Sequence, residues 1–225
     1  MKRRIIALLV LAGTALAVLG GIAAAGTSSS EARKPHDHAS HSSAFQGTPA
    51  ANLRVTLDRL LGEHAALAMN ATNLGVTGSK SFPAAAKALD QNSVELSRAI
   101  ASIYGKKAGN VFLNGKFQWR AHIGFFVDYT VAVAKKNKAA QAKAVANLKR
   151  YTVEHGKFLA TATGLSVAAV QNDLLGHVLE LKAQLDSYAA GDFSKAASLY
   201  RDAYDHMFHT GDLLAGAIAK QKNLK

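Results

Sequence analysis

The fold is decided by the stretch Leu53-Arg-Val-Thr-Leu57-Asp-Arg-Leu60-Leu61-Gly-Glu-His64. Its leucines recur at intervals of three, four or seven residues, and the series continues to Leu67 and Leu74. This period places the leucines on one face of an α-helix, whereas a half-buried strand would alternate apolar and polar residues. The stretch therefore predicts a long helix with one buried face.

Breaks rich in glycine or lysine divide the chain after this stretch into further segments of the same kind. The breaks are residues 75–81, 105–115, 136–138, 164–166 and 191–192. Helix starts are indicated by Pro83 in a first turn and by the capping residues Ser166 and Asp192. We expect one all-α domain, a six-helix bundle that covers residues 52–225.

An internal repeat refines this prediction. Residues 148–155 align with residues 199–206 at three identical positions, and both segments end in a histidine, His155 or His206. On the preceding helices, His122 lies between His64 and His177 at similar spacings. Regular self-similarity of this kind is typical of repeated helix pairs. We therefore expect the six helices to form three helix-pair repeats.

The first 51 residues have a different character. Three cations at positions 2–4 precede an apolar run at residues 5–25, which ends in the small-residue pattern Ala23-x-Ala25. This order is that of a signal peptide, although the run is also long enough to remain as an uncleaved membrane anchor. Residues 26–51 lack apolar periodicity and predict a disordered tether. We expect an exported protein, extracellular or held in the cell envelope.

Composition limits the chemistry and the partners of an exported chain. The protein has no cysteine, so any metal must be held by other side chains. Its net charge is +12, which becomes +9 when the signal peptide is removed. Outside the cytoplasm such a charge attracts an anionic envelope polymer or a membrane surface rather than nucleic acid. An envelope interaction module that binds no metal is one functional hypothesis.

The histidines of the helical region support a different hypothesis. His64, His122 and His155 have apolar neighbours at helical spacing, so they face a core. Helical bundles build metal sites from inward histidines and carboxylates of facing helices, and imidazole suits copper, with zinc or iron as alternatives. The other interpretation is that each histidine bonds singly to a neighbouring helix. The candidate ligands are His64, His122, His155, His177, His206 and His209, with Glu63, Glu95, Glu154, Asp202 and Asp205 as candidate carboxylate support.

Two further groups could bind ligands. The predicted tether carries His36, His38 and His41, a short tract of the kind that captures divalent metals. An aromatic group in the helical domain is a candidate pocket for haem or another organic ligand. It consists of Trp119, Phe125, Phe126 and Tyr129.

The sequence contains no catalytic motif. It lacks a Ser/His/Asp arrangement, a Gly-rich phosphate loop and a His-Glu-x-x-His helix. The leading hypothesis is therefore a non-enzymatic, exported helical bundle that binds a transition metal, copper first, through histidines in the middle of its helices.

Three stretches carry a resemblance to a known family. Residues 53–64, residues 119–129 and residues 213–221 resemble a family of exported bacterial all-helical proteins, and the likeness extends over nearly all of the chain after the tether. Members of this family are commonly labelled copper amine oxidase. Genuine copper amine oxidases are large β-rich enzymes that form a quinone from the tyrosine of an Asn-Tyr motif. This chain has no Asn-Tyr pair, so the resemblance implies export and a helical domain, and not amine oxidation.

Overall fold

The computed structural model of the protein describes residues 47–225, and this part of the chain is helical without any β-strand. The all-α prediction is thereby confirmed. The predicted signal peptide and most of the predicted tether, with His36, His38 and His41, lie outside the described residues. The helices are α1 (Pro49–Val76), α2 (Phe82–Tyr104), α3 (Lys106–Asn114), α4 (Trp119–Ala134), α5 (Lys138–Thr163), α6 (Val167–Ala189) and α7 (Phe193–Lys222).

Most helix boundaries follow the signals in the sequence. Helix α6 begins directly after Ser166, whose hydroxyl accepts a hydrogen bond from the Ala169 amide. Helix α7 begins after Asp192, whose carboxylate accepts one from the Lys195 amide. Helix α2 begins with Pro83 in its first turn. These starts confirm the prediction, because each side chain satisfies or removes an amide that a helix N-terminus leaves free.

One predicted break contains a helix. Residues 105–115 hold α3, which is nine residues long and buries Phe112 and Leu113. Gly109 lets α3 approach α2 closely, because a Cβ atom there would lie 2.6 Å from the Ser97 carbonyl oxygen. Reading this whole stretch as a break was wrong. Glycines are typical of a break between helices, and α3 is too short to show a clear helical period.

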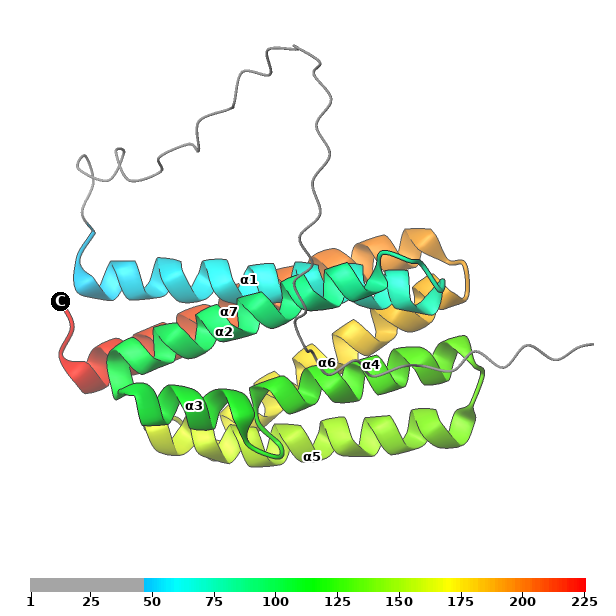
Figure 1. Cartoon of the computed structure of the whole chain (residues 1–225). Helices are drawn as coiled ribbons and strands as arrows, with labels where there is room; N and C mark the ends of the chain where they lie inside the picture. The colour runs from blue at the N-terminus through cyan, green and yellow to red at the C-terminus, as the bar shows by residue number, and fades with distance from the viewer. Residues whose placement is uncertain (1–46) are drawn as a thin grey trace, which may run out of the picture. The chain divides into compact units, whose positions relative to one another are not determined.

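The six longer helices of the described chain form three consecutive antiparallel pairs, α1 with α2, α4 with α5, and α6 with α7 (Figure 1). Helix α1 packs against α2, α4, α6 and α7, and α4 also touches α6. Helices α1, α4 and α6 therefore meet inside the bundle. Pairing in space does not test common ancestry of the pairs, so the repeat remains a prediction.

The leucine face of α1 supplies a large part of the core. Leu57, Leu60 and Leu61 are almost fully buried, and so is Leu148 of α5. Burial of one leucine side chain contributes about 1.5–3 kcal/mol, so the leucine period that predicts α1 also stabilises the bundle. Among the described residues, no helix has both the length and the apolar character needed to cross a membrane.

Candidate metal centre

Within residues 47–225, four histidines are buried inside the bundle, one from each of α1, α4, α5 and α6. His64 and His155 are completely buried, and His122 and His177 are 2% exposed. His64 and His177 lie near the middle of their helices, as predicted. His122 does not, because α4 begins at Trp119 and places His122 in its first turn. The short α3 occupies the residues that the prediction had left to the preceding break.

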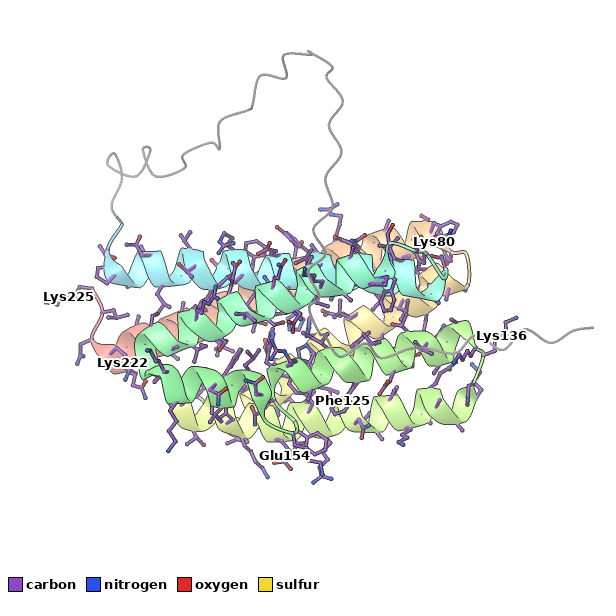
Figure 2. The ribbon with its side chains drawn as sticks, in the orientation of Figure 1. Lys80, Phe125, Lys136, Glu154, Lys222 and Lys225 are labelled. Carbon is purple, nitrogen blue, oxygen red and sulfur yellow. The ribbon has the colours of Figure 1, made fainter. Side chains whose placement is uncertain are left out.

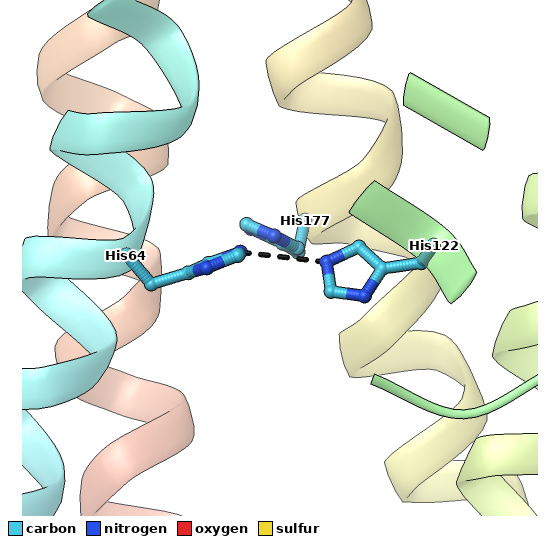
Figure 3. A group of neighbouring side chains, drawn as sticks. All are labelled: His64, His122 and His177. Carbon is cyan, nitrogen blue, oxygen red and sulfur yellow. Dashed lines mark hydrogen bonds between the residues drawn. The ribbon is translucent and has the colours of Figure 1, made fainter. Parts of the chain in front are cut away.

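Three of these histidines converge on one point. His64, His122 and His177 each offer a ring nitrogen, and these nitrogens all lie within 4.8 Å of one another. Figure 3 shows His64 and His122 pointing toward each other from opposite sides, with His177 beside them. The Nε2 atoms of His64 and His122 are 3.4 Å apart. We call these three residues the histidine triad.

The spacing of the histidine triad suits a metal ion. Zinc binds imidazole nitrogen at about 2.0–2.1 Å in tetrahedral geometry, which puts two ligand nitrogens about 3.3 Å apart. The 3.4 Å between His64 and His122 is close to this value. His177 offers a ring nitrogen within 4.8 Å of the other two. The triad can thus supply three ligands and leave one coordination position open.

Burial keeps these imidazoles neutral. It lowers the pKa of His122, His155 and His177 to about 3, because an imidazolium loses its hydration in the core. Burial, and then the nearby His122 and His177, lower the pKa of His64 well below its usual value. At neutral pH each ring therefore keeps the lone pair that a metal ion requires.

Several nitrogens of the histidine triad have no hydrogen-bond partner. Nδ1 of His64 and both ring nitrogens of His177 are buried and unpaired. A buried polar atom left unpaired costs about 1–3 kcal/mol. The Nε2 atoms of His64 and His122 lie within hydrogen-bonding distance of each other, so a metal ion held at these atoms and at His177 would pair an otherwise unpaired nitrogen only on His177. The predicted alternative, in which each histidine bonds singly to a neighbouring helix, does not describe His177.

Aromatic rings enclose the histidine triad. Trp119 lies against His64 and His122, with ring centroids 4.7 Å and 4.8 Å apart. Tyr151 of α5 stacks on His122 at 4.4 Å. The Tyr151 hydroxyl is buried without a partner, and burial raises its pKa well above the usual value. Together the rings exclude water from two sides of the triad.

His155 lies outside the histidine triad. It stacks with Tyr151 and Phe158, and its Nδ1 bonds to the side-chain oxygen of Gln118. A carbonyl oxygen only accepts, so Nδ1 of His155 carries the proton and Nε2 keeps the lone pair. Gln118 is the N-cap of α4 but caps no amide with its side chain. No sequence pattern indicated this contact.

His206 of α7 forms an ionic cluster beside His177. Its Nε2 lies 3.4 Å from Asp173 and its Nδ1 lies 2.9 Å from Glu180. The hydrogen bond to Asp173, with that to Glu180, raises the pKa of His206 to about 9 against the opposing effect of burial. The ring centroids of His206 and His177 are 6.4 Å apart. At neutral pH His206 is a cation between two carboxylates rather than a free metal ligand.

The remaining predicted ligands and supporting carboxylates are not part of the histidine triad. His209 is exposed although His206 is mostly buried, so the predicted pair does not share one environment. Glu63 and Glu95 pair with Arg59 at the surface. Figure 2 shows Glu154 at the outer side of α5. The last two predicted carboxylates are exposed on α7, and these are Asp202 and Asp205.

The four predicted pocket aromatics have separate surroundings. Trp119 covers the histidine triad, and Phe125 packs against Phe117 nearer the surface. The Tyr129 hydroxyl donates to Asp186 at 2.7 Å. Phe126 borders a cavity of about 20 Å³ that also touches His64 and His122. A haem could not enter a cavity of that size, so the geometry does not favour the haem interpretation.

A comparison of the chain with protein-family models, curated proteins and solved structures found no match. The function must therefore be inferred from the site itself.

Proposed function

We propose that this protein binds one transition metal ion through His64, His122 and His177. The observation that carries the proposal is the convergence of three buried ring nitrogens, from three different helices, within 4.8 Å. Neutral imidazoles are ligands for copper, zinc and iron. No motif for catalysis accompanies them, so we propose a binding or carrier function rather than an enzyme.

We further propose that copper is the preferred ion and that binding takes place outside the cytoplasm. Copper stands highest in the general affinity order of divalent ions for nitrogen ligands. Export rests on the cations at positions 2–4 and the apolar run at residues 5–25. The net charge of the exported part, +9, would favour contact with anionic envelope polymers or membranes.

Metal analysis of the full-length chain tests the proposal. His36, His38 and His41 are replaced with serine, so that binding by the N-terminal tract does not contribute. Calorimetry and elemental analysis should then find one copper or zinc ion per chain. Absence of stoichiometric binding of copper, zinc and iron would refute the proposed function.

Two further variants locate the ion. His177→Gln should weaken metal binding by at least about 100-fold. Loss of a residue that only hydrogen-bonds to a metal ligand already lowers metal affinity about 10–100-fold, and loss of a ligand itself costs more. His209→Gln is the matched control, since His209 is exposed on α7, and it should leave the affinity unchanged. Equal effects of the two variants would place the ion elsewhere.

A further inference from the structure

The histidine triad has an open coordination position if it holds a metal ion. Three imidazoles occupy three sites, and zinc or copper in a tetrahedral site takes a fourth ligand. The carboxylates nearest to His177 are Asp173 and Glu180, and both are engaged by His206. Neither carboxylate is then free to bind the ion, and a fourth ligand from outside the chain needs space beside the rings.

That space exists on the side of the triad that Trp119 and Tyr151 do not cover. The cavity of about 20 Å³ borders His64 and His122, the two residues whose Nε2 atoms are 3.4 Å apart. Because a water molecule needs about 10–15 Å³ measured in this way, the cavity has room for one or two heavy atoms. A larger ligand does not fit without movement of the helices.

The cavity extends from the histidine triad toward the surface between α2 and α4. Its outer lining includes Phe82, Ala86, Ile123 and Val127, all of which are half-buried. These two helices make few contacts with each other. The four side chains of the outer lining are apolar, so a charged ligand would lose its hydration on entering the cavity. The path thus selects a neutral molecule.

We infer that the cavity between α1, α2 and α4 admits a neutral ligand of one or two heavy atoms to the open position of the metal ion. Water, dioxygen and carbon monoxide belong to this class. The inference rests on the proposed metal site and adds the class of ligand that reaches it.

Carbon monoxide bound to the copper(I)-loaded, full-length protein is a suitable probe. Infrared spectroscopy reports the bound molecule, and flash photolysis reports its rate of association. Ala86→Leu should narrow the path and slow association at least tenfold while copper stays bound at one ion per chain. Ala84→Leu is the matched control, because Ala84 is exposed on the same helix, and it should have no effect.

A second variant acts in the opposite direction. Val127→Ala should widen the path and speed association, so the inference can be tested even if Ala86→Leu disturbs folding. Copper binding without any infrared band of bound carbon monoxide would overturn the inference and leave the proposed metal site standing. Equal association rates in all three variants would also overturn the proposed path. Failure to bind copper, zinc or iron would overturn both proposals.

Discussion

Lowering the pH should destabilise the metal-free protein, because buried histidines resist protonation. The pKa of His122, His155 and His177 is about 3 in the folded chain and about 6.5 in an unfolded one. Below pH 6.5 the unfolded state therefore binds more protons than the folded state, so stability falls as the pH falls. The loss continues down to the folded pKa, near pH 3.

The size of this effect follows from linkage. Between pH 7 and pH 5.5 each of the three histidines lowers the free energy of unfolding by about 1.2 kcal/mol, which gives a total of about 4 kcal/mol. His64 acts in the same direction. His206 acts in the opposite direction, because its folded pKa is raised to about 9. It raises the free energy of unfolding by less than about 1 kcal/mol between pH 7 and pH 5.5. Without the contribution of His64, the net loss is about 3 kcal/mol, a large share of a typical total of 5–15 kcal/mol.

Urea denaturation followed by circular dichroism at pH 7 and pH 5.5, in the presence of a chelator, measures this loss. His177→Gln should reduce the difference between the two pH values by about 1.2 kcal/mol, and the exposed His209→Gln should not. A free energy of unfolding that is equal at the two pH values would refute the argument that these rings are buried and neutral. Stoichiometric copper should raise the free energy of unfolding at both pH values, because it binds the folded state, and should leave the pH-dependent loss in place, because the rings are already neutral in the folded chain.

Three other changes, one of them with a control, test the packing of the bundle. Tyr151→Phe should raise the free energy of unfolding by about 1 kcal/mol in urea denaturation, because it removes a buried hydroxyl that has no partner. Gly176→Ala should lower the pKa of His206 in an NMR titration, since a Cβ atom there would lie 2.8 Å from His206 Cε1 and push it from its carboxylates. Gly124→Ala, where nothing lies within 4 Å, should leave that pKa unchanged and stabilise α4 by up to about 1 kcal/mol. Leu148→Ala should cost about 2–5 kcal/mol in the same denaturation assay, because Leu148 is completely buried.

The helical fold could be predicted because its signals are local. The leucine period of α1 and the capping residues Ser166 and Asp192 act within a few residues of the chain. Helix α3 was not predicted, because its two buried side chains, Phe112 and Leu113, span too few turns to show a period. Its packing depends on Gly109 meeting α2, which is a contact between helices.

The candidate site was only partly predictable. Helical spacing correctly indicated that His64, His122 and His155 face the core. It could not indicate that His155 is held by Gln118, or that His206 is engaged by two carboxylates. The acidic residues chosen for support were close to histidines in sequence, but neighbours in a helical sequence point in different directions.

The sequence by itself determined that the chain is helical, that any metal must be bound without thiolates, and that several histidines face inward. The tertiary structure alone decided which of them meet. Helical periodicity sets the direction of a side chain about its own axis, whereas the meeting of His64, His122 and His177 depends on how α1, α4 and α6 pack against one another. That packing is set by contacts between residues far apart in the chain.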